Sequence, residues 1–228
     1  MRLGSMTISR VHFPVTTLGF GRRIGLWAQG CSICCPGCIN PDTWDFAGGW
    51  KVTVEELLAL TRRWLPAADG ITITGGEPFD QPAGLQALVQ ALRREFGGDI
   101  LAFSGYNHEV LFAKHPAIVQ HLDVLITGPF DLSAGQRLYL RGSDNQRVFL
   151  LSPKAKSRYP ADIDVRRWEG PRHLDFFFDG TDAFMAGIPK PDFPVTLRRG
   201  LASVNLGCSL VTHKPVRKES AAFRKQHE

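Results

Sequence analysis

The sequence predicts an α/β protein with a partial, open parallel βα barrel and a C-terminal extension. Short apolar strands alternate with amphipathic helices between residues 24 and 126, which is the βαβ pattern of a mostly parallel sheet. A complete eight-fold barrel typically needs about 250 residues, and the chain has 228. The alternation weakens after residue 150, so we expect a core over residues 1–151 and an extension over 152–228 that packs on it.

The first third of the chain predicts two strands and a helix. Residues 7–16 mix β-branched and aromatic residues around a proline, which is typical of a first or edge strand. Residues 24–28 form a short apolar run that predicts a buried strand. Thr53 and Glu56 form a capping box at the start of a helix, which Pro66 ends.

The middle third continues the alternation. Strands are expected over residues 70–74, 99–103 and 123–126, where β-branched and apolar residues cluster. Residues 82–96 carry leucines at helical spacing and end at a glycine pair, and residues 107–121 predict one or two further helices.

The last third is less regular. Residues 152–171 are polar and proline-containing, which predicts a loop, whereas 173–178 predict a strand. Residues 183–199 are proline-rich, residues 201–211 are a candidate last or edge strand, and residues 213–228 read as a basic, polar tail.

Composition narrows the class of protein. Hydrophobic residues make up 43% and charged residues 21%, as in ordinary globular proteins. No apolar run reaches about 18 residues and the N-terminus lacks a hydrophobic signal region, so we expect no membrane segment and a cytoplasmic location. The net charge of +5 is scattered, without interleaved aromatic residues, so nucleic-acid binding is not expected.

Four of the five cysteines lie in one short stretch, which predicts a metal site in a reducing compartment rather than disulfides. Cys31, Cys35 and Cys38 form a C-x₃-C-x₂-C array. Clustered thiolates favour zinc, copper(I) or an iron–sulfur cluster, and three ligands leave a fourth position open for a reactant. The alternative is structural zinc, with a fourth ligand from Cys34, His108 or Cys208. We interpret Cys34 and Cys208 instead as small buried side chains.

Two glycine-containing motifs follow predicted strands. Because ligand-binding loops lie beyond the carboxyl ends of parallel strands, both are expected on the rim that carries the cysteines. Paired glycines let backbone carbonyls approach a ligand, and a carboxylate suits a cationic group. The alternatives are an ordinary strand–helix turn and a strand end with an aromatic anchor. The motifs are Gly75-Gly76-Glu77-Pro78 and Ser104-Gly105-Tyr106.

A third polar segment covers residues 140–147 and includes Arg141, Ser143, Asn145, Gln146 and Arg147. It offers many hydrogen-bond donors, but a structural turn is an equally good interpretation.

Other polar residues stand beside the cysteine loop. Gln29 and Asn40 flank it and are candidates to orient it by hydrogen bonds. Arg22 and Arg23 are interpreted as solvated charges.

The array, its flank Cys38-Ile39-Asn40-Pro41 and the later motifs resemble the radical S-adenosylmethionine (SAM) enzymes over roughly residues 10–150. The resemblance is strongest to the activating enzymes of glycyl radical enzymes, above all the anaerobic ribonucleotide reductase activating enzyme. It implies a [4Fe–4S] cluster on Cys31, Cys35 and Cys38. It also implies SAM held by residues of the three rim motifs, namely Gly75, Gly76, Glu77, Pro78, Ser104, Gly105, Tyr106, Ser143 and Asn145.

The resemblance further implies an activity. The reduced cluster would cleave SAM to a 5′-deoxyadenosyl radical that abstracts hydrogen from a glycine of a partner glycyl radical enzyme. The electron would come from a low-potential, flavodoxin- or ferredoxin-like donor. Three features depart from the family pattern: Gly19-Phe20-Gly21, Thr127 and the extension 152–228. The alternatives are a radical SAM enzyme that modifies a peptide or small metabolite, and a non-catalytic zinc or iron–sulfur sensor.

Overall fold

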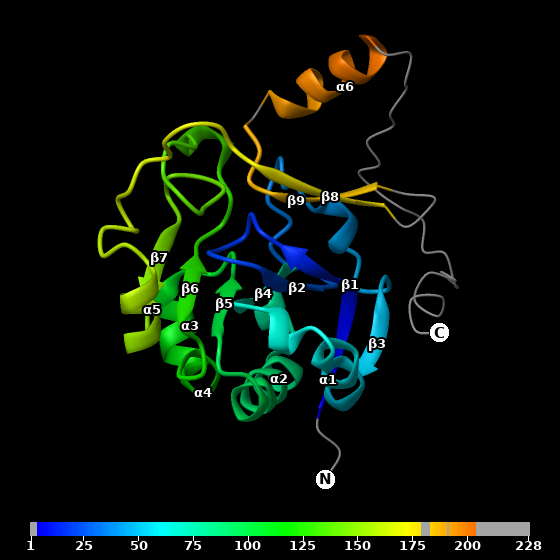
Figure 1. Ribbon diagram of the computed structural model, residues 1–228, viewed down its shortest axis with the longest axis vertical. Helices are drawn as coiled ribbons and strands as arrows, with labels where there is room; N and C mark the ends of the chain where they lie inside the picture. The colour runs from blue at the N-terminus through cyan, green and yellow to red at the C-terminus, as the bar shows by residue number, and fades with distance from the viewer. Residues whose placement is uncertain (1–3, 179–182, 191, 204–228) are drawn as a thin grey trace.

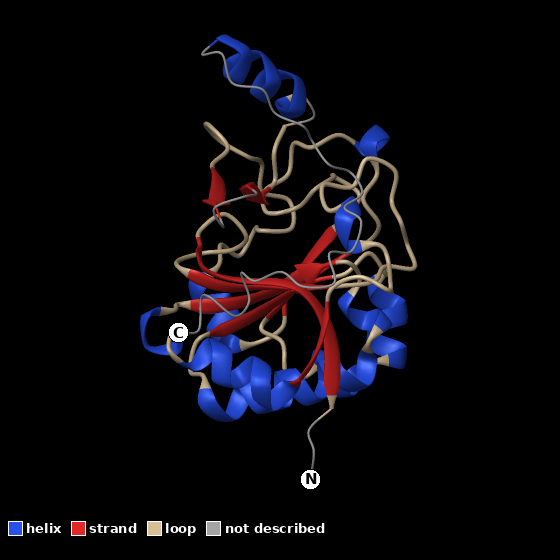
Figure 2. Cartoon of the chain, turned by 90° about the vertical axis from the view of Figure 1, so that its right-hand side faces the viewer, coloured by secondary structure: helices blue, strands red, loops and turns tan. Residues whose placement is uncertain are grey.

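The computed structural model describes residues 4–178, 183–190 and 192–203, and shows a central sheet with helices over one face (Figures 1 and 2). The seven strands lie in the order β3-β1-β2-β4-β5-β6-β7, and β8 and β9 form a separate hairpin. The strands are β1 (Ser5–Val15), β2 (Arg23–Ala28), β3 (Trp50–Thr53), β4 (Gly70–Gly75), β5 (Asp99–Phe103), β6 (Val124–Thr127), β7 (Arg147–Leu150), β8 (Leu174–Phe178) and β9 (Ala183–Gly187). The α-helices are α1 (Val54–Arg62), α2 (Pro82–Glu95), α3 (His108–Lys114), α4 (Pro116–Val119), α5 (Pro153–Arg158) and α6 (Phe193–Ser203).

The middle of the sheet is parallel. β2, β4, β5 and β6 pair in parallel in that order, whereas β1 and β7 join them antiparallel. All residues of β2 and β6 are buried, because both faces of the sheet are covered. The predicted α/β class and mostly parallel sheet are confirmed. In the described residues the sheet remains open, with β3 and β7 at its edges.

Helices α1 to α4 pack on one face of the sheet. The crossovers α1, α2 and the α3–α4 pair connect successive parallel strands, and Figure 2 shows them as one layer below the sheet. Leu57 of α1 and Leu85, Leu88 and Leu92 of α2 are buried in the core that this layer forms with the sheet. The predicted capping box is present, since Thr53 Oγ1 accepts the Glu56 N–H at 3.2 Å and the Glu56 carboxylate accepts the Thr53 N–H at 2.7 Å. None of the described helices is long and apolar enough to cross a membrane.

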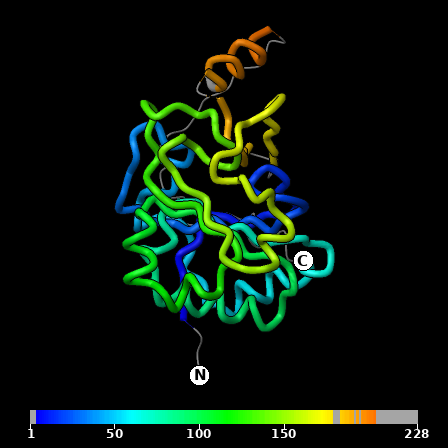
Figure 3. Tube along the Cα trace, turned by 90° about the vertical axis from the view of Figure 1, so that its left-hand side faces the viewer, coloured from blue at the N-terminus to red at the C-terminus, as the bar shows by residue number. Residues whose placement is uncertain are grey.

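The opposite face of the sheet is covered by loops and the short helix α5 rather than by a layer of helices. The segment that follows β6 folds over it, as the path in Figure 3 shows. A second core forms there from Leu101, Val124, Ile126, Leu140, Val148, Ala155, Tyr159 and Ile163.

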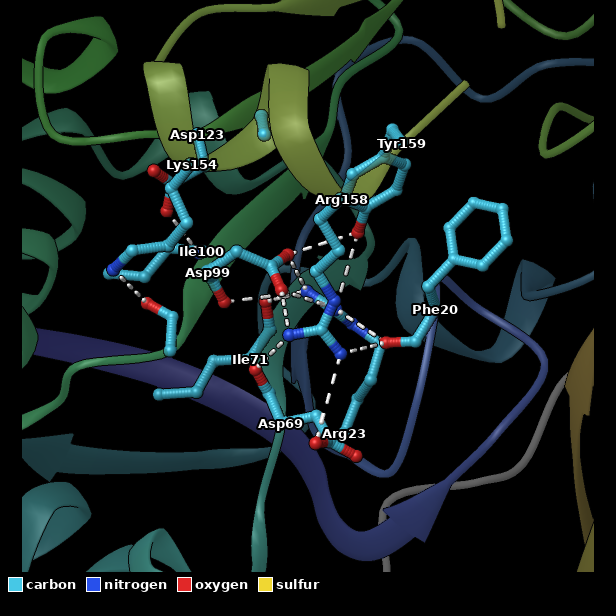
Figure 4. Close-up of polar contacts among 12 residues, drawn as sticks. Phe20, Arg23, Asp69, Ile71, Asp99, Ile100, Asp123, Lys154, Arg158 and Tyr159 are labelled. Atoms are coloured by element: carbon cyan, nitrogen blue, oxygen red, sulfur yellow. Dashed lines mark hydrogen bonds and ion pairs between the residues drawn. The ribbon is translucent and has the colours of Figure 1, made fainter.

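A buried ion pair lies at the amino ends of β2 and β5 (Figure 4). Arg23 and Asp99 are both fully buried, and their side chains meet at 2.8 Å. Arg23 also donates to the Thr72 hydroxyl at 2.6 Å. Asp99 further accepts from the Tyr159 hydroxyl at 3.0 Å and faces Arg158 at 3.0 Å, so residues after α5 are joined to the sheet. The interpretation of Arg23 as a solvated charge is therefore wrong, whereas Arg22 is exposed.

The β8–β9 hairpin docks on the end of β1. The Asp175 carboxylate accepts hydrogen bonds from the backbone N–H and the hydroxyl of Thr16, at 2.7 and 2.8 Å, and from the Thr17 hydroxyl at 2.9 Å. The ring of Phe177 lies 3.7 Å from that of His12, measured between centroids. This hairpin confirms the predicted strand over 173–178. Its second strand, β9, was not predicted, because the segment 183–199 is proline-rich.

Several other sequence expectations need correction. β3 and β7 were not expected as strands; each has four residues and pairs at an edge of the sheet. The segment 152–171, expected to be a loop, contains the helix α5. Ser152 caps this helix at its amino end, and the buried Ala155 packs it against the core. The candidate strand over 201–211 is wrong at its start, where residues 201–203 complete α6. Its remainder and the tail over 213–228 lie outside the described residues.

Replacing Arg23 by methionine should lower the free energy of unfolding by about 3–5 kcal/mol, because the buried Asp99 carboxyl would lose its fully buried partner. Urea unfolding monitored by circular dichroism measures this loss. Arg62→Met is the matched control, since it breaks an exposed pair with Glu95 and should shift the midpoint little. Equal shifts in the two variants would contradict the importance of the buried pair.

Candidate active site

The cysteine loop leaves the carboxyl end of β2 and closes on itself. Gly30 N–H donates to the carbonyl of Thr43 at 2.8 Å, and Cys31 N–H donates to that of Trp44 at 3.1 Å. Gln29 Nε2 donates to the Asp45 carbonyl at 2.7 Å, which ties the two ends of the loop together. Asn40 contributes through its backbone, whose carbonyl accepts from the Thr43 N–H at 3.0 Å and hydroxyl at 2.7 Å. The predicted orienting role of Gln29 and Asn40 thus has a structural basis.

The three thiols of the array are partly buried in this one loop. Burial raises the pKa of Cys31 to about 11 and also raises the pKa values of Cys35 and Cys38. Free thiols with such pKa values stay protonated at neutral pH, so metal binding must displace protons from them.

Backbone groups act on each of the three thiols. The Asn40 N–H donates to the Cys38 sulfur, and the backbone groups of Cys34 and Phe130 act on Cys31 and Cys35; each lowers the pKa of its thiol against the effect of burial. The Asn40 bond is 3.4 Å long. Hydrogen bonds to cysteine sulfur stabilise thiolate ligands and tune the potential of an iron–sulfur cluster. The donor set therefore fits a thiolate-bound cluster.

The remaining cysteines do not add a fourth ligand in the described part of the chain. Cys34 is exposed, and its sulfur contacts the Cys31 carbonyl at 3.1 Å. The interpretation of Cys34 as a buried side chain is wrong because it lies on the outer side of the loop. Among the described residues, no three His, Cys, Asp or Glu side chains form a group that could hold one metal ion. Cys208 lies outside the described residues.

The Gly75-Gly76-Glu77-Pro78 motif lies directly beside the base of the cysteine loop. Gly76 N–H donates to the Ala28 carbonyl at 2.9 Å, and Glu77 N–H donates to the Gly30 carbonyl at 2.8 Å. A Cβ atom on Gly76 would lie 2.2 Å from the Gly30 oxygen, so no larger residue fits there. The glycine is required by the close approach of two backbone segments.

Glu77 connects the first rim motif to the second. Its buried carboxylate accepts hydrogen bonds from the Phe79 N–H at 2.9 Å, the Ser104 hydroxyl at 2.9 Å and the Gly105 N–H at 2.7 Å. Burial raises its pKa to about 7, against the opposing effect of these donors. Ser104 and Gly105, predicted as ligand contacts, thus hold Glu77 in place.

A hydrogen-bonded clamp joins the cysteine loop to the same rim. Asp80 accepts from the Ser32 N–H at 2.7 Å, the Ser32 hydroxyl at 3.0 Å and the Tyr106 hydroxyl at 2.7 Å. Asp80 was missed in the sequence because a carboxylate two residues after Gly-Gly-Glu-Pro resembles an ordinary helix start. Its position one residue before Gln81, whose side chain binds the backbone of Thr7 and Gln29, places it where the rim segments meet.

The third polar segment supports a turn that reaches the cysteines. Ser143 Oγ accepts the Asp131 N–H at 3.0 Å, and Asn145 Nδ2 donates to the Pro129 carbonyl at 2.8 Å. These bonds hold the turn that contains Phe130, whose backbone lowers the pKa of Cys35. Arg141 and Arg147 both face Asp164, at 3.3 and 2.7 Å, and so serve the fold rather than the rim.

A cavity of about 210 Å³ opens beside the cysteine loop. Strand residues Trp27, Thr74 and Phe103 form part of its wall, Cys38 and Asn40 lie on the loop side, and residues 185–190 close it from the extension. The carboxyl ends of the parallel strands, the cysteine loop and the C-terminal hairpin therefore meet around one space.

The raised pKa of Glu77 predicts a dependence of stability on pH. Between about pH 4.5 and 7 the folded chain keeps a proton that the unfolded chain loses, so this residue lowers the free energy of unfolding by about 3 kcal/mol as pH rises. Urea unfolding at a series of pH values should therefore show a smaller fall in Glu77→Gln than in the wild type. Glu109→Gln, an exposed carboxyl, should keep the wild-type pH dependence. An unchanged fall in Glu77→Gln would contradict the raised pKa.

The clamp predicts a spectroscopic effect. Asp80→Asn removes an acceptor that three donors share, so iron-loaded protein should lose iron to a chelator about tenfold faster and show a broadened electron paramagnetic resonance spectrum. Asp162→Asn is the control, at an exposed carboxyl of the 159–168 segment. A wild-type spectrum and iron-loss rate in Asp80→Asn would show that the clamp does not position the cysteine loop.

Comparison with known proteins identifies the family. A family model described as "4Fe-4S single cluster domain" matches residues 17–149. The anaerobic ribonucleoside-triphosphate reductase-activating protein of Salmonella typhi is 34% identical over 60% of this chain and 94% of its own length. Its counterpart in Haemophilus influenzae is 31% identical with the same two coverages. The pyruvate formate-lyase-activating enzyme of Clostridium pasteurianum is 31% identical over 53% of this chain, which spans only 52% of that relative.

Among solved structures, QueE from Escherichia coli matches 46% of this chain and 54% of its own chain, with 22% identity and a TM-score of 0.39. The sequence matches bear out the predicted resemblance to activating enzymes. This chain belongs to the 4Fe-4S single cluster domain family, among the relatives of the pyruvate formate-lyase and anaerobic reductase activating proteins.

Proposed function

We propose that this chain is a radical SAM enzyme of the activating type, which binds a [4Fe–4S] cluster through Cys31, Cys35 and Cys38. One observation carries the proposal: three partly buried thiols lie on one loop, beside the glycine rim of the next parallel strand. Three thiolates leave one position of a four-iron cluster for a small chelating molecule. When bound, the reduced cluster and SAM supply a carbon radical that abstracts hydrogen.

The residues of this chain orient and shield that chemistry. In the proposal, the backbone at Gly75 and Gly76 approaches SAM closely, and Glu77 fixes this backbone between the loop and β5. Tyr106 contributes through the Asp80 clamp, which holds the loop. Ser143 and Asn145 contribute by supporting the turn that carries Phe130. The apolar walls at Trp27 and Phe103 exclude water from the reacting atoms.

The proposed substrate is a glycine in a flexible loop of a partner enzyme, as the names of the relatives suggest. Hydrogen abstraction there would store a glycyl radical for later turnovers. The electron would come from a low-potential, flavodoxin- or ferredoxin-like donor in the cytoplasm. We further propose that residues 1–151 carry the cluster and SAM sites on a partial barrel, and that residues 152–228 form an extension.

A second candidate activity is modification of a peptide or small metabolite. It is favoured by one observation, namely that residues 185–190 of the extension wall the cavity opposite the cysteine loop. A wall at this position narrows the space that a folded partner must enter. The radical chemistry is the same in both cases, so the products distinguish them.

The test of the function is cleavage of SAM under strict anaerobiosis. Protein reconstituted with iron and sulfide, then reduced, should form 5′-deoxyadenosine from SAM. The triple variant Cys31→Ala, Cys35→Ala, Cys38→Ala should bind little iron, because the cluster would lose every protein ligand. It should therefore form no 5′-deoxyadenosine.

Cys34→Ala is the matched control, since it removes an exposed cysteine from the same loop and should retain both iron and activity. Tight binding of one zinc ion without iron, or 5′-deoxyadenosine formation by the triple variant, would refute the proposal.

A further inference from the structure

The wall of the cavity that faces the cysteine loop comes from outside the region shared with the family. The family match ends at residue 149, whereas Met185, Ala186, Gly187, Ile188 and Lys190 line the cavity. This part of the wall therefore lies outside the residues that the family model matches.

This wall is held firmly against the sheet. Ala186 and Ile188 are buried in a core with Val15, Leu18 and Trp27. The Asp175 carboxylate binds the backbone and hydroxyls at the end of β1, as described above. A wall fixed in this way can present polar groups to a ligand at a defined position.

Arg172 fixes the polar part of the wall. Its guanidinium donates to the Gln136 side-chain oxygen at 3.3 Å and to the Pro189 carbonyl at 3.1 Å, and it also contacts the Gln136 carbonyl. Its charged group lies 5.0 Å from the ring of Trp168. Because Arg172 binds the side-chain oxygen of Gln136, the amide of Gln136 retains two N–H donors beside the cavity.

The positive charge on this side has no ion-pair partner among the residues that the structure describes. Among the described residues that line the cavity, Lys190 is the charged one, and Gln136 lines it as well. In the described residues neither Lys190 nor Arg172 makes an ion pair. Asp144, the carboxylate that acts electrostatically on Arg172, is itself bound by Arg137 at 2.7 Å.

We propose that Lys190 and the Arg172-held amide of Gln136 form a subsite for an anionic group, a carboxylate or a phosphate, of the molecule that the enzyme modifies. The Lys190 ammonium is exposed to solvent and lines the cavity together with the Gln136 amide. An ammonium and amide N–H donors favour an anion, because a charge-assisted hydrogen bond is stronger than a neutral one. This inference rests on the proposed function in one respect, because it assumes that the reaction takes place in this cavity.

The subsite also gives the extension a role. The apolar walls at Phe103, Phe130 and Trp27 accept many ligands, whereas a cation selects one kind of group. Selection would arise because an anion gains charge-assisted hydrogen bonds from the ammonium and the amide, whereas a neutral ligand does not.

Calorimetric titration of iron-loaded, full-length protein at low ionic strength tests the subsite. The probes are succinate, inorganic phosphate and the neutral isostere succinamide, each with and without SAM. Succinate or phosphate should bind and succinamide should not, and the tighter of the two anions identifies the group. Lys190→Met should weaken anion binding at least about tenfold, as expected for loss of a charged hydrogen-bond partner. Lys190→Arg should retain it.

Lys156→Met is the matched control, because it removes an exposed lysine of α5 and the same net charge. Any of four results would overturn the subsite: no binding of either anion, equal affinity for succinamide, the same loss in both lysine variants, or displacement of the anion by SAM. Cleavage of SAM is measured separately on the wild type. Anion binding without cleavage of SAM would refute the proposed function and support the subsite. Cleavage of SAM without anion binding would support the proposed function and refute the subsite.

Discussion

The buried carboxyl of Glu77 is the constraint on which the arrangement of the site depends. It lies between the ends of β4 and β5 and accepts hydrogen bonds from Phe79, Ser104 and Gly105, while its own N–H binds the first turn of the cysteine loop. A carboxyl removed from water needs such donors, and each donor in turn loses its freedom to move. One residue thereby sets the distance between the cysteine loop and two strand ends.

The rest of the molecule keeps those strand ends in register. The Arg23–Asp99 pair joins β2 to β5 at the opposite, amino ends of the strands, and Tyr159 adds the segment after α5 to the same group (Figure 4). Helices cover one face of the sheet, so the polar loops are left to the other face and to the carboxyl ends. The site is thus placed by a rigid sheet that is fixed at both ends.

The extension changes what such a site can accept. In a chain that ended with β7, the cavity beside Cys38 would lack the wall formed by residues 185–190. Here that wall adds buried apolar contacts from Ala186 and Ile188 and a cation, Lys190. In the proposals made above, the radical chemistry and the choice of substrate come from different parts of the chain, so one domain can serve several reactions.

The sequence by itself determined the alternation of strands and helices, the capping box at Thr53 and the three-cysteine array, because periodicity, caps and ligand spacing are local properties. Only the tertiary structure decided that Cys34 is exposed, that Arg23 is buried against Asp99 and that Asp80 clamps the loop through Tyr106. It also decided that Asp175 binds Thr16, 159 residues earlier in the sequence, and so attaches the β8–β9 hairpin to the end of β1. These features rest on partners far apart in the chain, and a carboxylate or a cysteine has the same local pattern whichever partner it meets.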